Sequence, residues 1–174
     1  MPYIMCSGKL RRQLGYIGRR RTDIPDGRMS GVFLGPWAAK VFTDQGRELI
    51  LGVETRTYLT LLFPLPPAAQ FQLRFAEALA SAFADAGVPR VSARAECAAV
   101  EFEPLVPLRN RQLTSVLNDI EFFCGIEFAY HDDLRTVQRN LNLIPYPHLD
   151  PCEPIAVIKR LFKPAEPIER FIAH

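Results

Sequence analysis

The sequence predicts one α+β domain over residues 1–174, with a mainly antiparallel sheet of about four to five strands packed with several amphipathic helices. A chain of 174 residues fits a single domain and is long enough to bury a sizeable core. Apolar residues at 48% and charged residues at 23% are typical of globular proteins. The strand-like segments cluster instead of alternating regularly with helices, which favours an α+β fold over a doubly wound parallel sheet.

The N-terminal region combines two short elements with a basic loop. Pro2–Ser7 has the composition of a strand, and Lys9–Leu14 is expected to form a short helix that glycines end. The segment from about 15 to 35 holds five glycines and several arginines, which favours a mobile surface loop. Residues 1–30 carry seven basic side chains against two acidic ones, so the basic charge is concentrated at one end.

Three strands are expected to follow as an antiparallel meander. Trp37–Thr43 and Glu48–Val53 are apolar runs separated by Asp44-Gln45-Gly46-Arg47, a loop that suits a hairpin. Arg56–Phe63 is a third run, and the prolines after it cannot continue a ladder of hydrogen bonds.

Two long helices and one more strand are predicted in the middle of the chain. Pro67–Ala86 repeats apolar residues at helical spacing, and the following Gly87 is a typical C-terminal stop. A short helix is expected within 89–98 and a strand within 99–103. Arg111–Tyr130 is the second long helix, because its apolar residues follow the three-four spacing of a buried stripe.

Shorter helices are expected towards the C-terminus. Asp132 or Asp133 can cap a helix whose apolar positions run from Leu134 to Ile144. The proline-rich stretch 145–154 is expected to be extended, and a last helix follows from Ile155. Residues from about 164 are expected to form a polar tail.

Several classes of protein are disfavoured. No uncharged stretch is long enough to cross a bilayer, and the apolar-then-basic N-terminus reverses the order of a secretory signal. The cysteines stand singly, without a Cys-x-x-Cys pair or a zinc spacing, at Cys6, Cys97, Cys124 and Cys152. We therefore expect a cytoplasmic protein with no metal site, no cofactor and no contact with membranes.

The helix starting at Arg111 carries the most informative pattern. At about 100° per residue, Arg111, Ser115, Asn118 and Phe122 lie opposite the apolar stripe, with Asp119 at the edge. Either this helix is buried on both sides, or it presents a mixed polar and aromatic patch to a partner or ligand. In the ordinary structural alternative, Asn110 caps the helix and the other side chains make surface contacts.

The N-terminal arginines suggest a second kind of contact. Arg19, Arg20 and Arg21 could bind phosphate through charge and bidentate hydrogen bonds. No recognition helix accompanies them and the overall charge is only +2, which favours a solvated loop over a nucleic-acid site.

Several motifs follow one another in a characteristic order. They are the Trp37 strand, the Arg47 strand, the Thr57 run ending in Phe63-Pro64, Asn110-Arg111 spaced eight residues before Asn118-Asp119, and Leu141-Asn142 before Pro145. This order resembles a family of bacterial proteins catalogued only as a domain of unknown function. The chain departs from the family pattern where Val53-Glu54-Thr55 replaces Thr-Asn-Glu and where Ser115 replaces a glycine. The resemblance implies a bacterial origin, one domain and no established activity.

Three hypotheses about function follow. The first is a non-enzymatic binding or interaction domain, with a protein partner or a second copy on the far face of the 111–128 helix. The second is a small enzyme whose site is assembled from Arg111, Asn118, Asp119 and a group on the sheet such as Glu54, close to Thr57. The third is nucleic-acid association through the basic loop. No catalytic residue is identified, because no phosphate loop, nucleophile elbow or dinucleotide motif is present.

Overall fold

The computed structural model describes residues 3–15 and 33–163, with the backbone alone at 101–104. The polar tail predicted from residue 164, and most of the loop predicted over 15–35, lie outside the described residues. The fold is α+β, as the sequence predicts, with a five-stranded sheet and six α-helices in the described part of the chain.

The sheet has the strand order β4-β3-β2-β1-β5. Its strands are β1 (Tyr3–Cys6), β2 (Trp37–Asp44), β3 (Arg47–Glu54), β4 (Thr60–Pro64) and β5 (Glu101–Pro107). The pairs β2–β3 and β3–β4 are antiparallel, which confirms the predicted meander. At the hairpin turn, Gln45 and Gly46 have φ of 46° and 77°, as the favoured two-residue turn between twisted strands requires.

The prediction of a mainly antiparallel sheet needs correction, because the sheet is mixed. The short strand β1 lies between β2 and β5 and is parallel to both. Neither β2 nor β5 is joined to β1 by a hairpin. Turn residues next to β1 therefore do not reveal the direction in which this strand runs relative to its neighbours. An apolar run of four residues indicates a strand but not the orientation of its partners.

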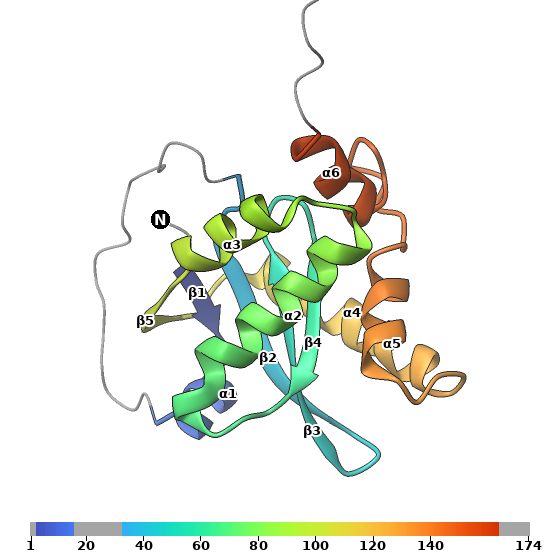
Figure 1. Ribbon diagram of the computed structural model, residues 1–174. Helices are drawn as coiled ribbons and strands as arrows, with labels where there is room; N and C mark the ends of the chain where they lie inside the picture. Colours follow the sequence, from blue (N-terminus) through green and yellow to red (C-terminus); the bar gives the residue numbers. More distant parts are fainter. Residues whose placement is uncertain (1–2, 16–32, 164–174) are drawn as a thin grey trace, which may run out of the picture.

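Helices occupy both faces of the sheet (Figure 1). Their bounds are α1 (Gly8–Gln13), α2 (Phe71–Asp85), α3 (Arg90–Ala99), α4 (Arg111–Phe128), α5 (Leu134–Leu141) and α6 (Pro154–Leu161), and a 3₁₀ turn over Ala68–Gln70 leads into α2. Gly87 has φ of 71° and ends α2 where the sequence predicts. None of the helices within 3–15 and 33–163 combines the length and hydrophobicity needed to cross a bilayer.

Alternate residues of the central strands enter two separate cores. Trp37 and Ile50 face α2, where the ring of Phe75 packs edge-on against Trp37 at 5.1 Å. Leu51 faces the other way, into the core that α4 and α5 cover with Leu117 and their other buried residues. Because strand side chains alternate between faces, both sides of the meander are buried.

Two buried amides, Gln138 of α5 and Asn142 at its C-terminal cap, cover the outer edge of β4. The Asn142 side chain accepts from the Thr60 N–H at 2.7 Å and donates to the Thr60 carbonyl at 2.8 Å. Gln138 accepts from the Leu62 N–H at 2.8 Å. The next residue of β4 whose backbone faces outward is Pro64, which has no N–H. The N–H groups of Thr60 and Leu62 are therefore unavailable to another strand.

Candidate functional site

Helix α4 begins at a side-chain cap and buries one stripe. The Asn110 side chain accepts from the Leu113 N–H at 3.1 Å, so the predicted cap is present. Leu117 and Ile120 are fully buried against β2 and β3, in the core on the α4 side of the sheet. This packing fixes which side of α4 points away from the sheet.

The opposite side of α4 is exposed along its whole length, and we call it the outer face of α4. Its members on α4 are Arg111, Ser115, Asn118, Asp119, Phe122 and Ile126, and Tyr130 extends it in the turn after the helix. The side chains of Phe122, Ile126 and Tyr130 are 68%, 43% and 80% exposed. Phe123 lies beside this face, with its ring 5.9 Å from that of Phe122. The helix is therefore buried on one side only, and its other side changes from polar to aromatic towards the C-terminus.

Asn118 also joins α4 to the sheet. Lys40 of β2 donates from Nζ to the Asn118 side-chain oxygen at 2.7 Å and forms an ion pair with Glu121. The Lys40 side chain is only 17% exposed, so its aliphatic part is covered where β2 meets α4. Asn118 thus has a structural contact in addition to its place on the outer face.

Asp119 lies near a group of aromatic side chains beneath α4. The Tyr58 ring meets the rings of Tyr146 and His148 at 5.0 Å and 4.7 Å. Burial raises the pKa of Tyr146 to about 12, with smaller contributions from Tyr58 and from the charge of Asp119. The Tyr146 hydroxyl is buried and has no hydrogen-bond partner among the described residues.

Glu54 and Thr57 are brought together in the turn after β3, away from solvent. The Glu54 side chain is fully buried. Its carboxylate accepts from the Gly35 N–H at 2.6 Å, the Arg56 N–H at 3.0 Å, the Thr57 N–H at 2.6 Å and the Thr57 hydroxyl at 2.7 Å. A Cβ at Gly35 would lie 2.8 Å from the Glu54 Oε1 atom, so glycine permits this approach.

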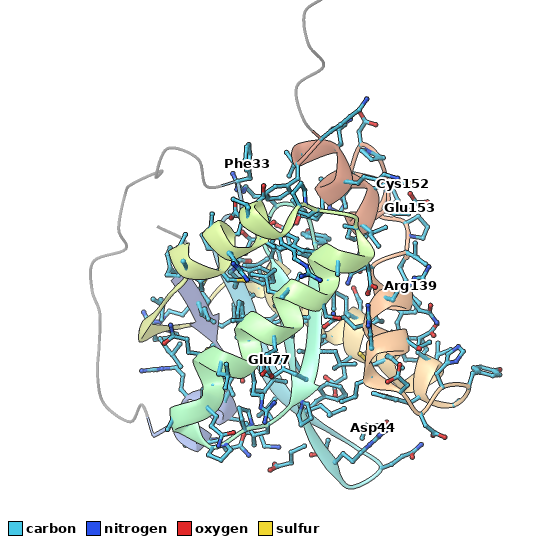
Figure 2. The ribbon with its side chains drawn as sticks, viewed as in Figure 1. Phe33, Asp44, Glu77, Arg139, Cys152 and Glu153 are labelled. Atoms are coloured by element: carbon cyan, nitrogen blue, oxygen red, sulfur yellow. The ribbon has the colours of Figure 1, made fainter. Side chains whose placement is uncertain are left out.

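Glu96 of α3 is a second buried carboxylate, which sequence reasoning missed. It accepts from the Phe33 N–H at 2.6 Å and the Leu34 N–H at 3.2 Å (Figure 2, where Phe33 is labelled near α3). Burial raises the pKa of Glu96, and the nearby Glu54 adds to the increase, while the two backbone hydrogen bonds oppose it. No sequence signal marks Glu96, because a single glutamate in a short helix normally faces water.

The residues of the enzyme hypothesis do not line one cavity near the start of α4. A cavity of about 320 Å³ is lined there by Asn110, Gln112 and Leu113 together with Tyr58 and residues of the sheet. Arg111, Asn118, Asp119 and Glu54 are not part of its lining. The structure thus separates the candidates into a buried turn at Glu54 and Thr57, a helix cap at Asn110, and an exposed face on α4.

Arg19, Arg20 and Arg21, the residues of the nucleic-acid hypothesis, lie outside the described residues. Within the described ranges, no group of three or more histidine, cysteine, aspartate or glutamate residues could hold a metal ion.

The fold and the outer face of α4 define a class: an α+β domain with a mixed five-stranded sheet and an exposed polar-to-aromatic helix face. The family model described as a domain of unknown function (DUF6933) matches residues 3–157, so the chain belongs to this family. The match confirms the resemblance seen in the sequence. Comparison with curated proteins finds no match.

Proposed function

We propose that this chain is a non-enzymatic interaction domain that binds a protein partner through the outer face of α4. One observation carries the proposal: Phe122 and Ile126 expose large apolar side chains on one side of a well-packed helix, and Tyr130 adds another in the turn directly after it. Single exposed apolar residues are ordinary, whereas several on one helix face are typical of a binding surface.

The composition of the face suits a protein partner. Aromatic anchors such as Phe122 and Tyr130 supply much of the free energy of binding at interfaces, because burying them removes a large apolar area from water. Arg111, Ser115 and Asp119 continue the same face with polar groups, which can form the hydrogen-bonded rim of such an interface.

The arrangement of Glu54 supports binding over catalysis at the residues considered. A general base needs a lone pair directed at its substrate. The Glu54 carboxylate is fully buried and already accepts hydrogen bonds from Gly35, Arg56 and Thr57. Its contacts are those of a structural group that holds the turn after β3.

The proposal keeps two expectations from the sequence, a bacterial origin and a cytoplasmic location. The resemblance to a family of bacterial proteins supports the first, and the singly placed cysteines support the second.

Quantitative capture of partners by the immobilised chain tests the proposal. We expect a bound protein to be lost, by at least about tenfold, when Phe122 and Ile126 are both changed to serine. The matched control changes Leu73 and Val91 to serine, two exposed apolar residues on α2 and α3, and should retain the partner. Equal retention by both double variants, with circular dichroism confirming that both fold, would refute the proposal.

A further inference from the structure

The cavity near the start of α4, which we call the α4 cavity, shares no lining residue with the outer face of α4. It has a volume of about 320 Å³ and lies where the start of β1, the turn after β3 and the start of α4 meet. The strand registers bring the first two of these segments to one end of the sheet, since Ile4 pairs with Trp37 and Trp37 pairs with Glu54. A volume of this size fits a small molecule.

Tyr58 lines the α4 cavity with a hydroxyl that has no partner among the described residues. The residue is only 6% exposed, and its hydroxyl forms no hydrogen bond within the described part of the chain. Unlike the hydroxyl of Tyr146, it is not sealed from solvent. A buried polar group without a protein partner takes its hydrogen bond from water or from a ligand. The Tyr58 hydroxyl is therefore available to a molecule in the cavity.

The backbone of Tyr58 is strained at this position. Its φ is 58°, in the left-handed region that a bulky side chain rarely adopts. The Tyr58 N–H donates to the Glu54 carbonyl at 3.0 Å, and the Leu59 N–H donates to the Thr57 hydroxyl at 3.2 Å, so the turn after β3 stabilises this conformation. Glycine would relieve the strain but would remove the side chain. Strain of this kind is concentrated at ligand sites, where it fixes a side chain before binding.

The start of α4 contributes backbone donors beside the same cavity. Asn110, which lines it, accepts from the Leu113 N–H with its side chain and from the Thr114 N–H with its carbonyl. The N–H groups of Arg111 and Gln112 donate to no described residue. Both groups lie at the positive end of the helix dipole, where unpaired N–H groups favour an anion.

The charges around the α4 cavity also favour an anion. Among the described residues, no acidic side chain lines it. Arg109 and Arg111 flank the helix cap in the sequence, and both are exposed and form no hydrogen bond or ion pair with a described residue. The carboxylate of Glu54, in the turn after β3, is already paired with Arg56 and held by its hydrogen bonds. The free charge at this end of α4 is therefore positive.

The lining also contains aromatic and aliphatic groups. Tyr3 and Tyr58 contribute phenol rings, and Met5, Pro36 and Leu113 add aliphatic groups. Such side chains pack favourably against a ring or a short hydrocarbon chain. The cavity thus combines donors for an anionic group with surfaces that suit an apolar one.

We infer that the α4 cavity binds a small organic acid. Its carboxylate accepts from the start of α4 and from the Tyr58 hydroxyl, and its ring or short chain packs against the apolar part of the lining. The inference goes beyond the proposed function, because it assigns a ligand site that the outer face of α4 does not include. A ligand of about ten heavy atoms with one charged group should bind with a dissociation constant on the order of 1 mM or below.

Binding of simple probe acids to the full chain tests the inference. Amide chemical shifts of the isotopically labelled chain are followed near pH 7 and at constant ionic strength during titration with benzoate, phenylacetate or hexanoate, up to about 20 mM. We expect saturable shifts at Thr55, Tyr58 and Gln112 for at least one acid, and at least about tenfold weaker binding of its neutral amide. Titrations in which no acid saturates, or in which an acid and its amide bind equally, overturn the inference.

Two further outcomes of the same titrations would contradict it. Shifts centred on Phe122 and Ile126 would show that the acid binds the outer face of α4 through its apolar part. Inorganic phosphate that binds as tightly as the acid would show that the apolar lining contributes nothing, so the class of ligand would be wrong.

A pair of hydroxyl deletions tests the role of Tyr58. Tyr58→Phe keeps the ring, and it should weaken binding of the acid by about tenfold, as expected for a lost hydrogen bond to a charged group. Tyr146→Phe is the matched control, because it removes another hydroxyl without a partner from the adjacent ring, outside the lining of the cavity. It should leave binding unchanged. With circular dichroism showing that both variants fold, equal affinities of the two overturn the inference.

A second pair of variants tests the charges. Arg109→Gln with Arg111→Gln removes the free guanidinium groups beside the helix cap and should weaken binding of the acid several-fold. Arg90→Gln with Arg94→Gln removes the same charge from exposed positions on α3 and should have little effect. Equal affinities of the two double variants would contradict the inference.

The ligand site and the interaction domain can fail separately. A chain that binds none of the acids still has the outer face of α4 as its proposed contact surface. Capture of proteins that is insensitive to Phe122 and Ile126 refutes the interaction domain and leaves the α4 cavity in place.

Discussion

Glu54 illustrates how one buried carboxylate organises the chain around it. Its four hydrogen bonds tie the turn after β3 to Gly35, just before β2 begins. Arg56 adds an ion pair, with its Nε 3.5 Å from the Glu54 carboxylate, and donates to the Phe33 carbonyl. This buried carboxylate is tolerated because the N–H groups of Gly35, Arg56 and Thr57 and the Thr57 hydroxyl all donate to it.

We predict that Glu54→Gln lowers the free energy of unfolding by about 2–4 kcal/mol. The glutamine amide nitrogen would face N–H donors and leave at least one of them unpaired. Urea denaturation measures the effect. Glu77→Gln is the matched control, since Glu77 is exposed and pairs only with Arg74 on the same helix, and it should cost no more than about 0.5 kcal/mol. Equal stability of Glu54→Gln and wild type would contradict this account of the turn.

The raised pKa of Glu96 predicts a pH dependence of stability. Because the folded state holds this proton more tightly than the unfolded state, the contribution of Glu96 is fully present below the ordinary pKa of 4.5. It is lost as the pH rises from 4.5 through the raised pKa. The stability of Glu96→Gln relative to wild type should therefore increase with pH in this window. Urea titrations at several pH values measure the difference, and a flat or decreasing difference would contradict the prediction.

At the scale of elements, α5 acts as the cover of an edge strand. Asn142 hydrogen-bonds both backbone groups of Thr60, as a neighbouring strand would, and Gln138 occupies the next position at Leu62. An uncovered edge strand is a template for pairing with other chains. The Leu141-Asn142 motif of the family resemblance thus has a physical role in this fold.

We expect Asn142→Ala to destabilise the protein by about 2–4 kcal/mol, because it leaves two buried backbone groups unpaired. It should also raise the tendency to aggregate, which light scattering after gentle heating can follow. Asn140→Ala is the control, because the Asn140 side chain bonds only the half-buried Glu127 and should cost about 1 kcal/mol or less. A similar loss of stability in both variants would contradict the special role of Asn142.

The elements were predictable where the local pattern is strong. The hairpin at Gly46, the end of α2 at Gly87 and the caps at Asn110 and Asp133 follow from turn and capping chemistry. The direction of β1 did not follow, because it depends on partners far away in the sequence. The strand β5 runs to Pro107, past the predicted end at residue 103, since a strand beside only one neighbour tolerates proline at Pro104.

At the scale of the molecule, the two cores assign different roles to the helices. The α2 side buries aromatic rings such as Phe75 and Trp37, while α4 covers the other face with one stripe and leaves its outer face to solvent. Helical periodicity predicted which residues of α4 point outward. It did not predict the hydrogen bonds by which Glu54 and Glu96 hold residues 33–35, because these bonds join residues distant in sequence.

The central claim is that the outer face of α4 is the surface through which this protein binds a protein partner. Amide chemical shifts of the isotopically labelled full chain, recorded with and without a captured partner, test it most directly. We predict shift changes centred on Phe122 and Ile126 and extending towards Arg111, with none at Leu73 or Val91. Shift changes centred on α2 and α3 would contradict the claim.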